Sequence, residues 1–318
     1  MNNISYNLYP EIEPYQSGWL EVSDIHQIYY EQCGKPDGKP VVFLHGGPGS
    51  GCNANQRRFF DPAHYRIILL DQRGCGRSKP LGNIVHNTTD ELVADIDALR
   101  RHLNIKRWLV FGGSWGSTLA LAYALRHSLD ITGLILRGIF LSRTSELRWF
   151  LHDARRFFPE AWEKLLAFIP SGEQGDMLAA YAKRVFSDEP TINIPAAISW
   201  NAYEGNIMTL RPPNGNGLPA SNEVQLARAR VQLHYIMHGC FVEQRDLLGE
   251  AAAALTHLPI IIVQGRYDMV CPPLTAWELR QVLPQAELHM IADAGHSAME
   301  AGTSAALIAA TEKFKILN

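Results

Sequence analysis

A single serine stands between glycines in the stretch FGGSWGS, residues 111–117. A hydrophobic run precedes it and a helical pattern follows it, so we expect Ser114 on a sharp turn from strand to helix. Gly112 and Gly116 would let strand and helix approach closely, and the helix N–H groups would favour developing negative charge at the hydroxyl. Ser114 is therefore a candidate nucleophile, with an ordinary glycine-rich turn as the alternative. A phosphate-binding loop is disfavoured, because no Gly-Lys-Ser/Thr follows.

A nucleophilic serine needs a base and an acid, which follow it in the order acid, then histidine, on a strand–turn–helix scaffold. Asp268 ends a hydrophobic run in GRYD, and His296 follows the last such run in DAGHS. His296 would take the serine proton and return it to the leaving group, while Asp268 would fix its tautomer. Asp293 precedes the loop that presents His296 and fills neither role. Each residue alone could be an ordinary turn or loop residue, but the three together predict a catalytic triad.

The stretch HGGPGSG, residues 45–51, follows another hydrophobic run. Glycine there allows a backbone N–H to point into a site with no side chain in the way. We expect the N–H groups of Gly47 and Trp115 to form an oxyanion hole, with a merely flexible loop as the alternative. DQRGCGRS, residues 71–78, also ends a run, and we expect Asp71 and Arg73 to brace the neighbouring loops.

Hydrophobic runs that alternate with helical patterns must position these residues. The runs are typical of parallel strands buried on both faces, and they cover residues 41–47, 66–74, 108–114, 133–140, 259–268 and 287–296. Helical spacing covers residues 88–103, 115–128 and 273–284. An early pair of segments, residues 18–24 and 26–34, is typical of a hairpin. The order predicts an α/β protein with a mostly parallel, doubly wound sheet.

A long gap separates the fourth run from the fifth. Residues 142–250 lack strand runs and are rich in aromatic residues, which predicts a helical insertion with a Pro/Gly/Asn loop at 211–219. An insertion above the carboxyl ends of the strands would form a lid over a site. We therefore expect a catalytic core of residues 1–141 and 251–318 and a helical cap of residues 142–250.

Composition narrows the partners and the compartment. The 318 residues are 47% hydrophobic and 19% charged, which is typical of a folded globular chain. Lys+Arg 29 against Asp+Glu 32 leave a net charge of -3, too balanced to indicate nucleic acid or an acidic membrane surface as partner. The first residues lack the apolar run of a signal peptide, and no stretch approaches the roughly 20 apolar residues of a membrane span. Five widely spread cysteines, with no Cys-x-x-Cys, are expected as free thiols in a cytoplasmic protein and not as metal ligands.

Seven motifs together resemble one family. HGGPG, DQRGCGRS, GGSWGS, LRGIF, WNAYEG, GRYD and DAGHS are similar to motifs of the proline iminopeptidases (prolyl aminopeptidases), serine peptidases of the α/β-hydrolase superfamily. The resemblance runs from about residue 10 to the C-terminus. HGGPG and the serine turn alone indicate only the superfamily, whereas GGSWGS together with WNAYEG is more specific. The resemblance implies an α/β-hydrolase fold with a lid, and release of N-terminal proline from small peptides through a prolyl ester on Ser114, without a cofactor or metal.

The resemblance also implies how the proline is held. Acidic lid residues of this family bind the ring nitrogen, and Glu204 in WNAYEG matches such an acid. A desolvated carboxylate suits a cationic secondary amine. Phe140, with Trp149 or Phe150, would line the ring pocket, and Arg137 would order the pocket or a nearby acid. A solvated surface for Glu204, and plain packing for the others, are the alternatives.

One position departs from the family pattern. The family's second lid helix reads Arg-x-Glu-Asn-His-Tyr, and residues 230–235 here read RVQLHY. Gln232 can accept a hydrogen bond through its carbonyl oxygen but supplies no charge, so we expect a weaker hold on the proline cation. Two other interpretations stay open: a related hydrolase acting on esters or other small N-terminal residues, and a non-catalytic ligand-binding protein. The sequence does not predict an oligomeric state.

Overall fold

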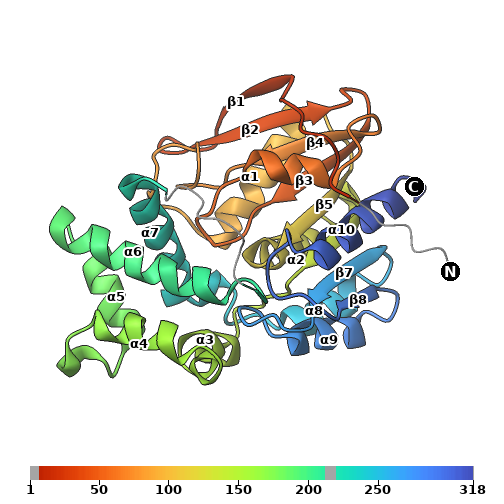
Figure 1. Cartoon of the computed structure of the whole chain (residues 1–318). Helices are drawn as coiled ribbons and strands as arrows, with labels where there is room; N and C mark the ends of the chain where they lie inside the picture. Colours follow the sequence, from red (N-terminus) through yellow and green to blue (C-terminus); the bar gives the residue numbers. More distant parts are fainter. Residues whose placement is uncertain (1–6, 212–219, 318) are drawn as a thin grey trace.

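The computed structural model describes residues 7–211 and 220–317. Eight strands form one sheet in the order β1-β2-β4-β3-β5-β6-β7-β8, drawn edge to edge across Figure 1. β2 pairs antiparallel with β1 and with β4, and the remaining neighbours are parallel. The strands are β1 (Gln16–Glu21), β2 (Gln27–Gly34), β3 (Lys39–Leu44), β4 (Tyr65–Leu70), β5 (Trp108–Gly113), β6 (Ile131–Arg137), β7 (Ile260–Gly265) and β8 (Glu287–Ile291). The predicted hairpin and the predicted parallel strands are thus confirmed.

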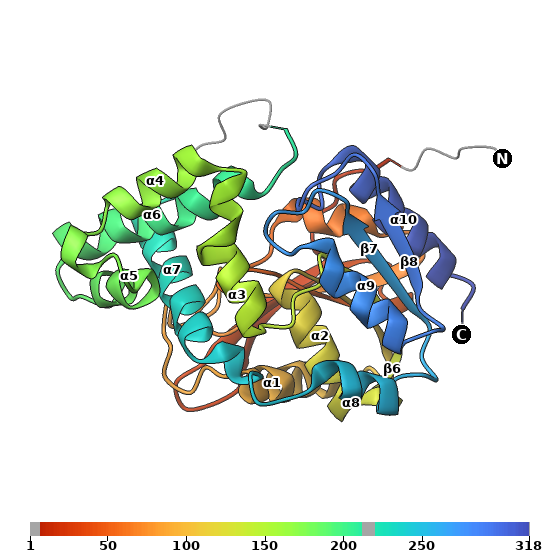
Figure 2. The ribbon, with the colours of Figure 1, turned by 90° about the horizontal axis from the view of Figure 1, so that it is seen from below.

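Helices cover both faces of the sheet, as Figure 2 shows from below. One face packs on α1 (Thr89–His102), α2 (Trp115–Arg126), α8 (Leu247–Ala254) and α9 (Pro273–Val282), and the other packs on α10 (Ala301–Phe314). β5 and β7 are buried along their whole length because they have helices on both sides. This arrangement is the predicted doubly wound α/β fold.

Strands end earlier than the hydrophobic runs predict. β6 stops at Arg137, although the run continues to Phe140, and β8 stops at Ile291, although its run was expected to reach His296. Gly138 has a φ of 58°, a conformation that turns the chain out of the sheet. The residues beyond these strand ends therefore lie in loops at the carboxyl edge of the sheet, where ligands bind in such folds.

The segment between β6 and α8 is helical and contains no strand among its described residues, 142–211 and 220–250. Its helices are α3 (Thr144–Leu151), α4 (Pro159–Ala167), α5 (Met177–Val185), α6 (Pro190–Ile207) and α7 (Asn222–Met237). They lie to one side of the sheet in both ribbon views. Of the loop expected at 211–219, residues 212–219 lie outside the described residues. None of the described helices is long and apolar enough to cross a membrane.

The helix α7 joins this segment to the sheet. Tyr235 Oη donates to Asn87 Oδ1 at 2.8 Å, and Thr89 Oγ1 donates to Cys240 O at 2.5 Å. Val231 and Tyr235 belong to the same apolar cluster as the strands, whereas a separate cluster fills the space among α3–α7. The inserted helices thus have their own small core and are attached through α7, and also through α3, where Glu146 accepts from Thr275 Oγ1 at 2.6 Å.

Candidate active site

Ser114 occupies the turn between β5 and α2, with φ 59° and ψ −130°. This left-handed backbone is strained for a residue with a side chain. The flanking glycines permit it: a Cβ on Gly112 would lie 2.1 Å from Gly116 O, and a Cβ on Gly116 would lie 2.2 Å from Leu44 O. The Ser114 N–H donates to Arg137 O at 2.7 Å. The expected sharp turn is therefore present, with the serine at the start of the helix.

Asp268 and His296 meet at the carboxyl edge of the sheet. His296 Nδ1 lies 2.7 Å from Asp268 Oδ2, and both side chains are almost completely buried. Asp268 Oδ1 accepts the N–H groups of Val270 and Cys271, at 3.0 and 2.8 Å. Gln264 Nε2 donates to Asp268 Oδ2 at 3.1 Å. These donors hold the carboxylate in place, so that it can orient the imidazole.

Arg137 connects His296 to Ser114. Its Nη1 lies 3.1 Å from His296 Nε2 and donates to His296 O at 3.0 Å, while its backbone carbonyl accepts the Ser114 N–H. A guanidinium only donates, so Nε2 is the acceptor and Nδ1 carries the proton shared with Asp268. Ser114 and His296, both among the described residues, share no hydrogen bond here. Burial lowers the pKa of Arg137, and the nearby Asp268 charge opposes that effect.

A small cavity of about 30 Å³ lies beside Ser114. Six of its lining residues were candidates from the sequence, namely Gly47, Ser114, Phe140, Phe150, Glu204 and Gln232, and the other six are Pro48, Glu146, Leu147, Ile236, Val270 and Cys271. Arg137 does not line it, since its guanidinium lies against His296 instead. Trp149 also lies elsewhere, with its indole N–H donating to Met269 O at 2.8 Å.

Of the six lining residues that the sequence did not indicate, Pro48 belongs to the HGGPGSG loop, and the other five come from loops and helix faces without a chemical motif. Only Glu146 and Cys271 among them have reactive side chains. Cys271 lies three residues after Asp268, and burial raises the pKa of its thiol well above the ordinary range, with the Asp268 charge adding to this. Glu146 accepts the N–H groups of Leu141 and Arg143, each at 3.0 Å, so it fixes the start of α3.

Glu204 reaches the cavity from α6 and is 4% exposed. Its Oε2 accepts from Arg228 Nη2 at 2.8 Å and from Gln232 Nε2 at 3.2 Å. Oε1 has no hydrogen-bond donor among the described residues. Glu204 therefore lies in the cavity wall and not on a solvated helix surface, with one oxygen open to a ligand.

Gln232 is fully engaged by protein groups. Its Oε1 accepts the Trp200 indole N–H at 2.6 Å, and its Nε2 donates to Gly47 O and to Glu204, each at 3.2 Å. The sequence predicts the Gln232 carbonyl oxygen as an acceptor for a substrate nitrogen, and in this structure that oxygen already accepts one hydrogen bond, from Trp200. The side chain instead connects α7 to the HGGPGSG loop.

Gln72 joins both parts of the expected oxyanion hole. Its N–H donates to His45 Nε2 at 3.0 Å, and its Nε2 donates to His45 O at 2.9 Å. Its Oε1 accepts the Trp115 indole N–H at 2.8 Å. Burial lowers the pKa of His45, which keeps Nε2 an acceptor. One side chain thereby connects the loop before Gly47 to the first residue of α2.

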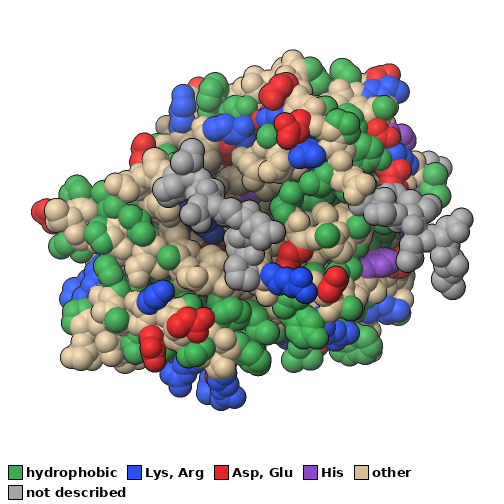
Figure 3. Space-filling view, in the orientation of Figure 1, with side chains coloured by type: hydrophobic (Ala, Val, Ile, Leu, Met, Phe, Trp, Pro, Cys, Tyr) green, Lys and Arg blue, Asp and Glu red, His purple; other side chains and the backbone are tan. Residues whose placement is uncertain are grey.

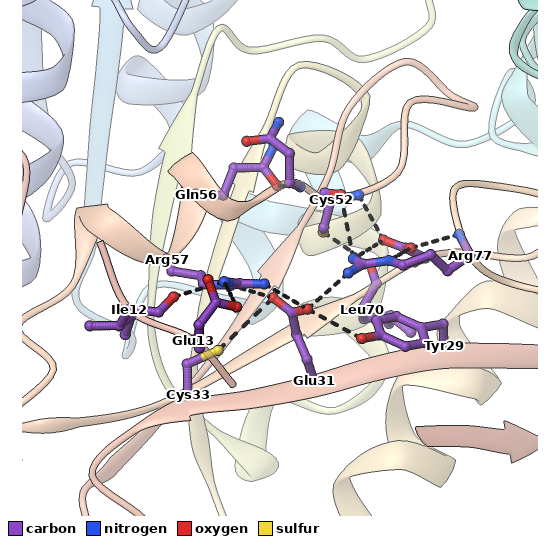
Figure 4. A network of polar contacts seen from close by, with 12 residues as sticks. Ile12, Glu13, Tyr29, Glu31, Cys33, Cys52, Gln56, Arg57, Leu70 and Arg77 are labelled. Atoms are coloured by element: carbon purple, nitrogen blue, oxygen red, sulfur yellow. Dashed lines mark hydrogen bonds and ion pairs between the residues drawn. The ribbon is translucent and has the colours of Figure 1, made fainter. Parts of the chain in front are cut away.

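A network of polar contacts connects Cys52 and Arg77 with Glu31 and Arg57 (Figure 4). Asp71 Oδ1 accepts the Cys52 N–H at 2.7 Å, and Asp71 Oδ2 pairs with Arg77 Nε at 2.7 Å. Arg77 also reaches Glu31 at 2.9 Å, and Glu31 pairs with Arg57 at 2.7 Å. Arg73 pairs with Asp95 on α1 at 2.6 Å. Asp71 and Arg73 therefore hold loops in place, as the sequence led us to expect.

One group of side chains has a spacing that could suit a metal ion. Ligand atoms of Asp97, His127 and Asp130 lie within 4.8 Å of one another. Arg100 Nη2 pairs with both carboxylates, at 2.7 and 3.3 Å, and so already supplies their counter-charge. The group lies at the far end of α1 and α2 from Ser114.

The sheet order, the serine turn and the covering helices define a class of protein. Residues 39–303 match the α/β hydrolase fold family, to which this chain belongs. Within that class, the chain belongs to the proline iminopeptidases. It is 52% identical over 309 residues to a probable proline iminopeptidase of Leptolyngbya boryana, covering 96% of each protein. It is 50% identical over 313 residues to a proline iminopeptidase of Arabidopsis thaliana, covering 98% of this chain and 82% of the relative.

Solved structures share the fold at lower identity. An esterase from Rhodococcus superposes with a TM-score of 0.62 at 18% identity, covering 97% of this chain and 100% of that chain. The proline iminopeptidase-related protein of Thermus thermophilus superposes with a TM-score of 0.58 at 22% identity, covering 95% of this chain and 98% of that chain. These likenesses concern the fold alone, and the expected α/β-hydrolase architecture is confirmed.

Proposed function

We propose that this chain is a serine exopeptidase that releases an N-terminal proline from small peptides. The observation that carries the proposal is the placement of Ser114 and Glu204 on the wall of one small cavity. A nucleophile and an acceptor for an amine would then fix the N-terminal residue with its carbonyl at the serine. The relatives named proline iminopeptidase support the choice of proline.

In the proposed first step, Ser114 Oγ attacks the carbonyl of the N-terminal residue. His296 Nε2 takes the hydroxyl proton, and the Asp268 carboxylate stabilises the resulting imidazolium through Nδ1. Nε2 must first exchange its contact with Arg137 for one with Ser114. The N–H groups of Gly47 and Trp115 would stabilise the oxyanion. His296 then gives the proton to the leaving amine, and a prolyl ester remains on Ser114.

In the second step, water attacks this ester. His296 takes a proton from the water and returns it to Ser114 Oγ, so that free proline leaves and the enzyme is restored. Phe140 and Phe150 would pack on the proline ring, and Glu204 Oε1 would accept a hydrogen bond from the ring nitrogen.

Residues 142–250 would act as the cap over a catalytic core of residues 1–141 and 251–318. The protein would act in the cytoplasm.

A pair of substrates tests the exopeptidase assignment. Proline 4-nitroanilide should be hydrolysed, and its N-acetyl derivative should not, because a blocked nitrogen no longer fits against Glu204. Release of 4-nitroaniline measures both reactions. Equal turnover of the two compounds would contradict an exopeptidase and favour a general esterase or amidase.

A second experiment tests the nucleophile. Ser114→Ala should lose at least about a thousandfold in kcat and keep the wild-type melting temperature, because it removes the attacking atom and little buried surface. Ser297→Ala, beside His296, serves as a control that should keep most activity. Substantial turnover by Ser114→Ala would place the nucleophile elsewhere.

A further inference from the structure

Both carboxylates in the cavity wall already have an arginine partner. Glu146 pairs with Arg143 at 3.2 Å, and Glu204 pairs with Arg228 at 2.8 Å. Gln232, the third long polar side chain of the wall, is neutral. Arg143 is shared with Glu278, which lies 2.7 Å from its Nη1, whereas Arg228 pairs with Glu204 alone among the described residues. The charge of Glu204 is therefore balanced by Arg228, although a cationic amine would bind best where negative charge is in excess.

Arg228 reaches Glu204 from the neighbouring helix α7. Its side chain is 32% exposed, whereas that of Glu204 is 5% exposed. Its Nε is buried and has no hydrogen-bond partner among the described residues. The guanidinium thus neutralises Glu204 without being surrounded by acceptors of its own. An ammonium at the free Oε1 would lie close to this positive charge and be repelled by it.

We propose that Arg228 is a specificity-determining residue, which by neutralising Glu204 weakens binding of acyl groups with a cationic nitrogen. The cavity would then accept uncharged five-membered-ring acyl groups, as esters, about as readily as prolyl groups. For the reaction itself this inference rests on the proposed function. The binding preference, however, belongs to the cavity and can be measured without turnover.

Binding of two ring compounds tests this directly. Pyrrolidine carries the proline ring as a cation, and cyclopentanol has a ring of the same size without charge. In Arg228→Met, we expect the dissociation constant of pyrrolidine to fall about tenfold and that of cyclopentanol to stay the same, as measured by NMR titration at pH 7. Arg230→Met is the matched control, because Arg230 is on the same helix and, among the described residues, hydrogen-bonds only the carbonyls of Val185 and Ser187.

Kinetics should show the same preference. In Arg228→Met, kcat/KM for proline 4-nitroanilide should rise about tenfold, mainly through KM, while that for 4-nitrophenyl cyclopentanecarboxylate stays constant. Adding Glu204→Gln to Arg228→Met should remove most of the gain, because the carboxylate that holds the cation is then lost.

The outcomes separate the two proposals. Unchanged pyrrolidine binding in Arg228→Met, or an equal change in Arg230→Met, would overturn the role of Arg228. Pyrrolidine binding could tighten as expected while neither the wild type nor Arg228→Met hydrolyses proline 4-nitroanilide. In that case the role of Arg228 stands and the proposed exopeptidase activity fails.

Discussion

At the scale of single residues, Gln232 has a role that its residue type did not indicate. Its amide contacts Trp200, Glu204 and the carbonyl of Gly47 at once. Since amide oxygen and nitrogen have different partners, the orientation of the group is fixed. A carboxylate of the same shape could keep the bond from Trp200 but would place an oxygen against two other oxygens.

Gln232→Glu is therefore expected to act in two opposite ways. It should lower the melting temperature, because a carboxylate facing Glu204 and Gly47 O is repelled by both. It should also lower KM for proline 4-nitroanilide several-fold, because a ring ammonium could then lie between two carboxylates. Gln232→Leu, which removes the hydrogen bonds without adding charge, serves as the control. A KM that does not fall in Gln232→Glu would contradict the expected effect of charge on substrate binding.

At the scale of elements, the site depends on how three loops are tied together. The loops after β3 and β4 and the start of α2 meet at Gln72, which contacts His45 and Trp115. The helix α7 packs closely on the loop after β3: a Cβ on Gly49 would lie 2.7 Å from Arg228 O. Each proposed oxyanion donor thus has its position set by a neighbouring loop and not by its own segment.

Gln72→Met should test this coupling. The variant leaves the Trp115 indole N–H and His45 O without partners, each at a cost of about 1–3 kcal/mol. We expect kcat to fall about ten- to a hundredfold with little change in KM, because a shifted oxyanion donor affects the transition state more than substrate binding. Gln32→Met is the control, since both glutamines are 2% exposed and Gln32 is on β2, away from the cavity. Stability loss in both variants with an unchanged kcat in Gln72→Met would indicate a purely structural role.

At the scale of the whole molecule, the charges are mixed and the thiols are shielded. Lys and Arg side chains alternate with Asp and Glu over the face in Figure 3, in keeping with the small net charge. All five cysteines are unpaired. Burial raises the pKa of each thiol, to about 12 for Cys33 and Cys240 and well above the ordinary value for Cys52 and Cys271. Cys75 shifts in the same direction for the same reason.

A thiol titration follows from these shifts. A thiol with a pKa of about 12 has only about one part in ten thousand as thiolate at pH 8, and the thiolate is the reactive form. We expect all five cysteines to react slowly with Ellman's reagent in the native protein at pH 8 and rapidly in guanidinium chloride. Rapid reaction of one native thiol would contradict the predicted shielding, and mass spectrometry would identify which one.

The sequence by itself determined the strands, the helices α1, α2 and α9, the helical character of the insertion and the candidates for the triad. These depend on local properties: a buried parallel strand needs a continuous apolar run, and the turn at Ser114 needs glycines two residues away. Ser114, Asp268 and His296 each follow a parallel strand, and the carboxyl ends of these strands lie at one edge of the sheet, so the three residues could be expected to meet there. Half of the cavity wall was also predicted, because those residues stand in recognisable motifs.

Only the tertiary structure decided which side chains contact one another. Gln232 and Gly47 are 185 residues apart in the chain, and Arg137 and His296 are 159 apart. Arg228 and Glu204 stand on different helices, so no spacing pattern connects them. Whether such groups form a hydrogen bond depends on how the helices pack over the loops, because a shift of about one ångström is enough to break the bond. Residue types and local periodicity do not specify that packing, because it results from the contacts of the whole chain.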